Sequence, residues 1–475
     1  MKTFLFCIGG SGARALKSLS MLLATGIEVK TDEIIPILID LDEQNGDFRR
    51  ASRILTSYKN ISNILDFKSG YFSTKINTLE DDLELQFADS NKTFGDYLSV
   101  QRLSQLNRDF LTSLFDASET SSPKAELNLK MDLGFQGNPN IGSIVFHDLK
   151  NSEAYKAFEG QVTQGDKIVI VSSIFGGTGS SGFPQLVRII KESNNIPVNS
   201  AEISAIIIQP YFQVKEDKNS SINSDLFNSK TKAALGYYIQ NLQADVNRFY
   251  LLADRPGNPI DNIKGGNRQE NKAHFIELLA ATGIIHAVNK GKEGNSKFYE
   301  FGIKDLRDPE RNLQAVDFKD FHDNSRWERL LKFSYFAKFY LHGLAERTKE
   351  TFFIQLNLKK QLIENPFFTE LFNFLKEYWI WLEEMSQSQR SFDPFNLNID
   401  APFSLYLKGS EYKGLDKKSG VMGFGAKDFF SGEFLNQLNE MENDGSLNIP
   451  QKFVRAASRV FDKMYSDYIV SLPHR

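Results

Sequence analysis

The sequence predicts an α/β fold, built on a mainly parallel sheet that helices cover on both faces. Short apolar runs rich in β-branched residues alternate with segments of helical periodicity through the first 290 residues, which is the pattern of such a sheet. Two of these runs pass directly into glycine-rich loops that precede helical segments. Strand, glycine loop and helix in that order are typical of a phosphate-binding turn, so we expect an anion site at the carboxyl edge of the sheet.

The elements follow one another along the chain with turn residues between them. Strands are expected at residues 3–8, 33–39, 167–173, 202–208, 248–253, 295–304 and 402–408. Helices are expected at residues 13–25, 151–163, 183–193, 224–244, 270–289, 325–350, 367–385 and 450–471. Residues 50–130 are polar, mixed and mostly helical in character, and residues 134–143 and 255–269 are loops rich in Gly, Asn and Pro.

The helix expected over residues 270–289 is apolar almost all round, which indicates burial. We place this central helix, residues 269–290, between two domains. The first, residues 1–268, is expected to be a Rossmann-like α/β domain that carries both glycine loops. The second, residues 291–475, is a divergent α+β C-terminal domain.

Composition and charge exclude several classes of protein. The 475 residues are 41% hydrophobic and 24% charged, which is ordinary for a soluble globular chain. The net charge is −4 with no basic stripe, so nucleic acid is not expected as a partner. No signal peptide and no membrane-spanning run is present, so we expect a cytoplasmic protein.

The sequence also lacks the usual signatures of metal sites and hydrolases. The single cysteine, Cys7, excludes an internal disulfide and is expected in the core. The six histidines have no metal-ligand spacing, so no protein metal cluster is predicted. Neither a Walker-type P-loop nor a G-x-S-x-G elbow occurs.

The first glycine loop comprises Gly9, Gly10, Ser11 and Gly12. The pattern Gly10-x-Gly12-x-x-Ala15 after a strand fits a dinucleotide fingerprint, with Asp40 as the acid for a ribose. One alternative is therefore an NAD-dependent oxidoreductase. However, Asp40 lies 30 residues after Gly10, later than the usual spacing of about 20. This alternative also leaves the second loop without a role.

The second loop contains four glycines and several hydroxyl side chains within residues 175–182. Glycines let the backbone approach a ligand closely, and successive N–H groups at a helix start can form an anion nest. We expect ligand contacts from Gly176, Gly177, Thr178, Gly179 and Ser180. A Gly177→Val substitution is expected to abolish nucleotide binding, because its side chain would block the approach of phosphate.

The segment GGTGSSG, residues 176–182, resembles the signature of the tubulin/FtsZ superfamily. The segment IGGSGARA is similar to the first phosphate loop of that family, and ILIDLDEQ is similar to the loop that places Asp40 and Asp42 beside phosphate and Mg²⁺. GFQGNPNIGS looks like the third loop, with Gly137 and Asn138 near the γ-phosphate. The resemblance implies a tubulin/FtsZ-like fold that binds GTP or GDP with Mg²⁺, in a prokaryotic member of the superfamily.

The same resemblance assigns the remaining nucleotide contacts. In DLFN, residues 225–228, it places Asp225 at the ribose hydroxyls and includes Asn228 among the nucleotide-binding residues. It places Asp254 and Asn271 at the guanine, with His274 as a substitute for the second. Arg14 follows the first loop, where the family has a small or polar residue, and we expect it either to reach a phosphate or to be a solvated helix residue.

The segment AVDFKDF carries Asp317 and Asp320, which resemble the catalytic acids that the next subunit supplies in this family. The resemblance implies a GTPase that assembles head-to-tail into filaments. If these two acids are merely solvated residues before a helix, Glu293 is the next candidate. A different alternative is a nucleotide-gated scaffold that does not polymerise, with the C-terminal domain recruiting a protein partner.

Overall fold

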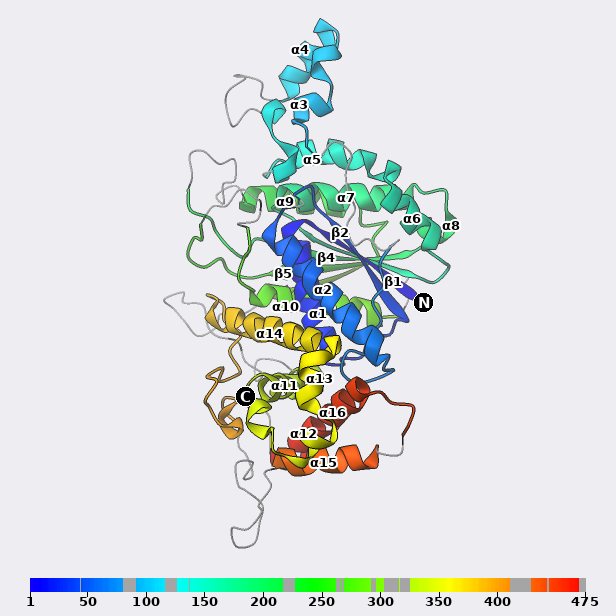
Figure 1. Cartoon of the computed structure of the whole chain (residues 1–475). Coiled ribbons are helices and arrows are strands. Elements are labelled where there is room, and N and C mark those ends of the chain that lie inside the picture. Colours follow the sequence, from blue (N-terminus) through cyan, green and yellow to red (C-terminus); the bar gives the residue numbers. More distant parts are fainter. Residues whose placement is uncertain are drawn as a thin grey trace.

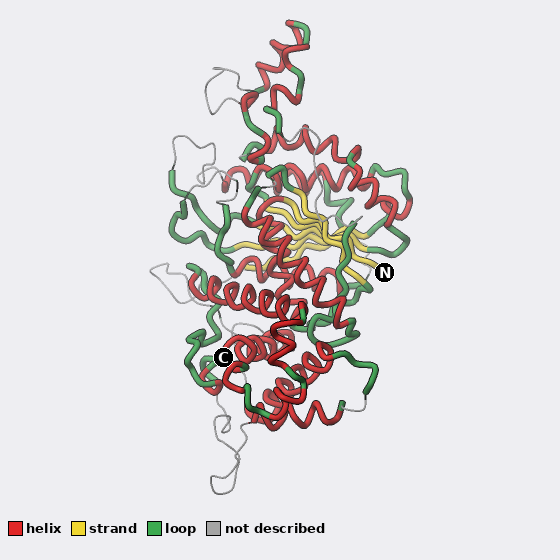
Figure 2. The backbone as a smooth tube through the Cα atoms, in the orientation of Figure 1, coloured by secondary structure: helices red, strands yellow, loops and turns green. Residues whose placement is uncertain are grey.

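The structure is a computed structural model. It describes residues 1–42, 44–79, 91–115, 126–135, 137–216, 227–261, 266, 269–291, 296–302, 316, 325–410, 429–441 and 444–469. Figures 1 and 2 show a sheet with helices on both faces, above a second body made of helices.

The sheet has six parallel strands in the order β2-β1-β3-β4-β5-β6. The strands are β1 (Lys2–Ile8), β2 (Glu33–Ile39), β3 (Lys167–Ser173), β4 (Glu202–Ile208), β5 (Arg248–Ala253) and β6 (Lys297–Gly302). β1 to β4 are buried at every residue after the first, which explains why their sequences are continuous apolar runs and do not alternate. The α/β class and these six strands are confirmed.

The order of strands reverses between β1 and β3. β2 lies on one side of β1, and the chain then crosses to β3 on the other side and continues outward. In open parallel sheets this switch point leaves a crevice at the carboxyl ends of the two strands, where ligands bind. Both glycine-rich segments follow these two strands.

Helices cover the two faces of the sheet (Figure 1). One face carries α1 (Gly9–Ala24), α2 (Gly46–Leu65) and α10 (Phe275–Asn289). The other carries α5 (Pro139–Phe146), α6 (Glu153–Gln161), α7 (Gly177–Lys191), α8 (Ile196–Asn199) and α9 (Phe227–Asn241). The predicted central helix is α10, and its burial is confirmed. It begins at Phe275, after His274 has capped it, and so starts later than the sequence predicts.

The segment before α5 projects from the body, beyond the face that α5 and α7 cover (Figure 1). It contains α3 (Phe94–Tyr97) and α4 (Gln105–Leu114). Leu106, Phe110 and Leu114 lie exposed on α4. No helix in the described part of the chain combines the length and the apolar character needed to cross a bilayer.

The second body packs against α2 through α14 and α16. Its helices are α11 (Ser325–Lys338), α12 (Thr351–Gln355), α13 (Leu358–Glu364), α14 (Pro366–Gln387), α15 (Phe429–Glu440) and α16 (Ile449–Tyr468). Aromatic side chains such as Phe336, Phe339 and Phe461 form its core. The helix expected over 325–350 changes into a π-helical turn at Phe339–Gly343.

The prediction of a strand at residues 402–408 is wrong. Phe403–Leu405 form a 3₁₀ turn, and only an isolated bridge joins Leu407 to Phe395. No other strand is available to extend this pairing among the described residues of 325–469. That part of the chain is helical, and the expected α+β character is not found there.

Candidate functional site

A cleft of about 1050 Å³, its open mouth included, lies at the carboxyl ends of β1, β2 and β3. The predicted site residues that line it are Gly9, Gly10, Ser11, Arg14, Asp40, Asp42, Gly137, Gly176, Gly177, Thr178, Gly179 and Asn271. The fold therefore brings together residues from both glycine segments, the end of β2, the third loop and the approach to α10.

Two helices begin at this cleft with their first turns uncapped. α1 starts at Gly9 directly after β1, and α7 starts at Gly177 with Gly176 as its N-cap. Neither N-cap residue makes a side-chain capping hydrogen bond, and neither first turn contains an acidic residue. The backbone N–H groups and the positive ends of both helix dipoles are therefore available to an anion.

The two glycine segments touch each other. A methyl group built on Gly9 would lie 3.5 Å from the Cβ of Thr178 and 3.7 Å from the backbone nitrogen of Gly179. Gly9 has φ +70°, a conformation that favours glycine. The helix starts are thus close enough to contact neighbouring groups of one ligand.

The individual glycines have different roles. A Cβ on Gly10 would meet only the Nδ2 of Asn45, at 3.9 Å, so this position opens into the cleft. A Cβ on Gly12 would lie 2.6 Å from the backbone carbon of Cys7, so Gly12 permits α1 to pack against β1 and does not line the cleft. The first segment therefore combines ligand access with helix–strand packing.

Gly177 lies against the third loop. A Cβ there would be 2.8 Å from the backbone nitrogen of Gly137 and 2.9 Å from the Cβ of Phe135. Any side chain at Gly177 would therefore collide with this loop. We predict from the sequence that Gly177→Val loses nucleotide binding because its side chain blocks the phosphate. A loss of binding in this variant could equally come from the collision with the third loop, so the variant does not distinguish the two causes.

Three carboxylates that line the cleft are almost fully buried: Asp40, Asp42 and Asp47. Burial, together with the charge of Asp42, raises the pKa of Asp40 to about 7, although hydrogen bonds from the Asp42 backbone and the Thr178 side chain oppose the rise. Burial also raises the pKa of Asp42, which accepts hydrogen bonds from the backbone N–H groups of Gly266 (2.6 Å) and Gln44 (3.2 Å). The acidic wall thus faces the helix starts.

Asp40 and Asp42 are suitable ligands for a Mg²⁺ ion whose remaining coordination positions are filled by phosphate oxygens and water. Mg²⁺ in nucleotide sites usually takes one or two carboxylates plus phosphate oxygens and water. The described residues contain no group of three or more His, Cys, Asp or Glu side chains able to hold a metal alone. The donors present therefore fit a metal that arrives with its nucleotide.

Arg14 lines the cleft, but Glu277 of α10 holds it in an ion pair. It also donates to the carbonyl of Lys272 at 3.1 Å, and its guanidinium lies over the ring of Tyr211. Burial lowers the pKa of Arg14, but Glu277 and other nearby groups raise it by more. Arg14 is buried and is thus not a solvated helix residue, which corrects that alternative. Its contact with a phosphate stays a prediction.

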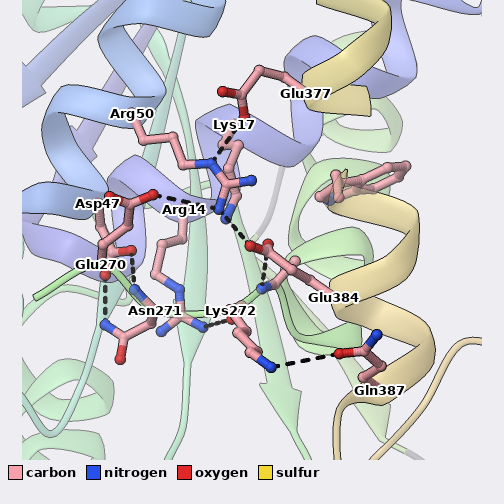
Figure 3. Close-up of polar contacts among 12 residues, drawn as sticks. Arg14, Lys17, Asp47, Arg50, Glu270, Asn271, Lys272, Glu377, Glu384 and Gln387 are labelled. Carbon is pink, nitrogen blue, oxygen red and sulfur yellow. Dashed lines mark hydrogen bonds and ion pairs between the residues drawn. The ribbon is translucent and has the colours of Figure 1, made fainter. Parts of the chain in front are cut away.

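Asn271 also lines the cleft, and its orientation is fixed by Asp47. The backbone N–H and the side-chain amide of Asn271 donate to the two carboxylate oxygens of Asp47, at 2.8 and 2.6 Å. Burial raises the pKa of Asp47, against the nearby charges of Arg14 and Lys17. Figure 3 shows Asp47 and Asn271 facing each other beside α2.

The same network continues from the cleft wall into the second body (Figure 3). Arg50 lies one turn after Asp47 on α2 and donates to Glu384 (2.8 Å) and Glu377 (3.2 Å) of α14. Glu384 also accepts the backbone N–H of Ala273, at 2.9 Å. The segment before α10 is therefore held between the cleft and α14.

Besides Gly12 and Asp254, three predicted contacts lie outside the cleft lining: Asn138, Ser180 and Asn228. The Ser180 hydroxyl donates to the carbonyl of Gly176, and the Asn138 amide donates to the carbonyl of Phe135 at 3.1 Å. Asn228 is exposed in the first turn of α9. Each of these side chains is engaged locally or faces away.

Two of the residues proposed to contact guanine, Asp254 after β5 and His274 before α10, have other partners. Asp254 is buried in an ion pair with Arg390, which donates to both carboxylate oxygens at 2.9 to 3.2 Å. Its carboxylate is therefore committed to the second body and does not line the cleft. His274 caps α10, and burial lowers its pKa to about 4. Asp225, Glu293, Asp317 and Asp320 lie outside the described residues.

The sequence analysis missed several side chains at the site. Phe175, Phe212 and Phe227 form an aromatic wall, with ring centroids of Phe175 at 5.5 and 5.0 Å from the other two. Asn45 caps α2 and also lines the cleft. An Asn just before a helical pattern is a recognisable capping signal, whereas the aromatic wall has no local signal because its members come from three separate segments.

No protein-family model matches the chain, and no curated protein matches it. The solved structures that are similar to it include three proteins, each matched over about 60% of this chain. These are CetZ2 from Haloferax volcanii in a GTPγS-bound protofilament (11% identity, 61% of this chain and 58% of that one, TM-score 0.28), a mutant FtsZ from M. jannaschii (14%, 60% and 55%, TM-score 0.28) and CetZ from Methanosaeta thermophila (13%, 61% and 54%, TM-score 0.29). The chain covers less than two thirds of each of these structures. With TM-scores this low the similarities carry no functional argument, so any conclusion about function rests on the cleft itself.

Proposed function

We propose that this chain binds a guanosine triphosphate together with Mg²⁺ in the cleft, as a tubulin/FtsZ-like GTPase. The observation that carries the proposal is the meeting of two uncapped helix starts, at Gly9 and Gly177, across the switch point of a parallel sheet. One helix start can hold one phosphate group. Two in contact, facing buried carboxylates, suit a phosphate chain that carries a metal ion.

The first turns of α1 and α7 would hold the phosphates by backbone N–H groups. Asp40 and Asp42 would hold the metal beside these helix starts, directly or through its water. The metal supplies neutralisation of the phosphate charge. At Gly10 a phosphate chain would be able to approach the backbone, because a Cβ there meets only the Nδ2 of Asn45, at 3.9 Å.

Asn271 is our candidate for recognition of the base. Its amide nitrogen is committed to Asp47, which leaves its carbonyl oxygen to accept hydrogen bonds. Guanine presents two N–H donors on its Watson–Crick edge. This supports guanine as the base and keeps Asn271 in the role that the sequence resemblance gives it.

Asp317 and Asp320 remain our candidates for the acids that orient water, acting on the nucleotide of a neighbouring subunit. On this proposal the chain associates head-to-tail and hydrolyses GTP only when assembled. Heterologous contacts of this kind need not close, and they lead to filaments.

GTP turnover per molecule, measured with Mg²⁺ against rising protein concentration with sedimentation in parallel, tests the proposal. A rate that begins above a threshold concentration, together with sedimenting protein, is the expected result. Tight GTP binding without turnover at any concentration would favour a nucleotide-gated scaffold that does not polymerise. Quenching of NADH fluorescence, without binding of a guanine nucleotide, would instead support the oxidoreductase alternative.

A further inference from the structure

A second pocket lies in the helical body, and its described lining shares no residue with the cleft. It opens between the π-helical turn Phe339–Gly343, with the residues that flank this turn, and the segment 399–403. Turns of this wider kind are frequent at functional sites. The cleft and its ligand therefore leave this pocket without a role.

Lys338, the last residue of α11, is a buried cation at this pocket. It is 2% exposed, and its Nζ donates to the backbone carbonyls of Asn398 and Ile399 at 3.3 and 3.2 Å. Among the residues that the structure describes, no carboxylate oxygen lies within ion-pair distance of this nitrogen. Burial lowers the pKa of Lys338, although the charge of Asp400 opposes the change. Long hydrogen bonds to two neutral carbonyls offset only part of the cost of burying an ammonium group.

His342 provides an unused polar atom in the same lining. Its Nε2 is buried, and no described residue forms a hydrogen bond with it. The ring packs edge-on against Trp379 of α14, with ring centroids 4.9 Å apart. Burial lowers the pKa of His342, and the charge of Lys338 lowers it further. A neutral imidazole that carries its proton on Nε2 is a hydrogen-bond donor, so His342 is available to an acceptor.

The charged side chains of the pocket differ in burial according to their sign. Lys338 is buried and Arg347 is half-buried, whereas Glu346 and Asp400 are exposed. A single negative charge is therefore favoured beside the buried cation, while the exposed carboxylates repel a ligand that carries several. Much of the remaining lining is apolar and comprises Leu341, Ile399, Ala401, Pro402 and Phe403. These surroundings favour a ligand with one anionic group on an apolar body.

We propose that this pocket binds a small organic monocarboxylate, whose carboxylate lies between the Nζ of Lys338 and the Nε2 of His342 and whose apolar body packs against Leu341 and Phe403. The ammonium group has three N–H donors, and the two carbonyls leave one for the ligand. The second carboxylate oxygen accepts the hydrogen bond from the imidazole. This site is separate from the cleft, so the inference does not rest on the proposed function.

Binding of phenylbutyrate and of its neutral analogue phenylbutanol to the full chain, followed by the NMR signals of the histidine rings, tests the inference. The two probes share the apolar body and differ in charge. We expect the carboxylate to bind at least about tenfold more tightly than the alcohol, as for one hydrogen bond to a charged group. The signal of His342 should shift, and its pKa should rise in the complex, because a nearby negative charge favours the imidazolium form.

Three variants separate ligand binding from structure. Lys338→Met removes the charge and should abolish the preference for the carboxylate. His342→Phe keeps the ring against Trp379, removes the donor and should weaken carboxylate binding several-fold without changing that of the alcohol; loss of its signal also assigns His342. Lys359→Met removes a charge from an exposed position on α13 and should match wild type. Thermal unfolding checks each fold, and His342→Phe decides the matter if Lys338→Met does not fold.

Each outcome bears on the proposal. Equal affinity of wild type for the two probes, no binding of either at millimolar concentration, or an unchanged His342 signal would overturn it. An equal loss of both probes in the variants would show a structural role for these side chains and would also overturn it. A loss confined to the carboxylate, present in Lys338→Met or His342→Phe and absent from Lys359→Met, would support it.

Discussion

Replacing Asp40 with asparagine should stabilise the ligand-free protein, and more so as the pH rises. Asp40 is 8% exposed at the end of β2, and it faces the charge of Asp42. Burial and that charge together raise its pKa from an ordinary 3.8 to about 7. Asparagine has the same shape and carries no charge, so Asp40→Asn removes the cost of ionising a buried group.

The magnitude follows from linkage between protonation and folding. Between about pH 4 and pH 7 the folded protein holds a proton on Asp40 that the unfolded chain has released. The free energy of unfolding of the wild type therefore falls as pH rises through this window. At about 1.4 kcal/mol per pKa unit the full cost above pH 7 is about 4 kcal/mol. Roughly 3 kcal/mol of this cost develops between pH 5 and pH 8.

Urea unfolding of wild type and Asp40→Asn at several pH values, without nucleotide or Mg²⁺, measures this difference directly. The variant should be the more stable at pH 8, with an advantage that shrinks toward pH 5. Asp467→Asn, at an exposed position in α16, serves as the matched control and should show no such trend. A difference that is constant with pH, or that grows as the pH falls, would refute the reasoning.

Four further substitutions test access to the cleft, the packing of α1 and the buried ion pair between Asp254 and Arg390. Gly10→Ala should lower nucleotide affinity at least about tenfold by calorimetry while the melting temperature does not fall, because its methyl group meets open cleft and alanine favours a helix. Gly12→Ala should instead lower the free energy of unfolding by about 1–3 kcal/mol in urea, because its methyl group collides with the backbone of Cys7; equal stability of the two variants would contradict this assignment. Arg390→Met should lower the free energy of unfolding by about 3–5 kcal/mol, because it leaves the buried carboxylate of Asp254 unpaired. Adding Asp254→Asn to Arg390→Met should recover part of that loss, and a fully additive double variant would argue against the ion pair.

The strands were predictable because their signal is local. Each is a short apolar run bounded by polar or glycine-rich residues, and burial on both faces makes the run continuous. The glycine segments were predictable for the same reason, since strand, glycine and helix follow one another directly. The sequence did not show that residues 177–182 already belong to α7, because glycine normally disfavours a helix interior and only packing against β3 and α5 explains its use there.

The partners of the charged residues were not predictable, because tertiary packing chooses them. Asp254 and Arg390 lie 136 residues apart, and nothing in either local sequence marks the pair. Likewise, the apolar alternation around Phe403 and Tyr406 suggests a strand, but no neighbouring strand edge lies beside it in the described residues. Tyr406 is instead buried against Tyr335 and Phe395. The local sequence pattern therefore predicts the strands and glycine segments that form the cleft. Ion pairs and hydrogen bonds between distant parts of the chain determine which side chains are left to contact a ligand.

The distribution of charge around the cleft limits what can bind there. The two helix starts attract anions through dipoles that fall off within one turn, while the buried carboxylates of Asp40 and Asp42 on the facing wall repel them. A polyphosphate without a metal would be attracted by the helix starts and repelled by the two carboxylates. A divalent cation bound by both the carboxylates and the phosphates turns this repulsion into attraction. On the proposed function, we therefore expect a phosphate ligand and its metal to bind in this cleft together, and each to bind far more weakly without the other.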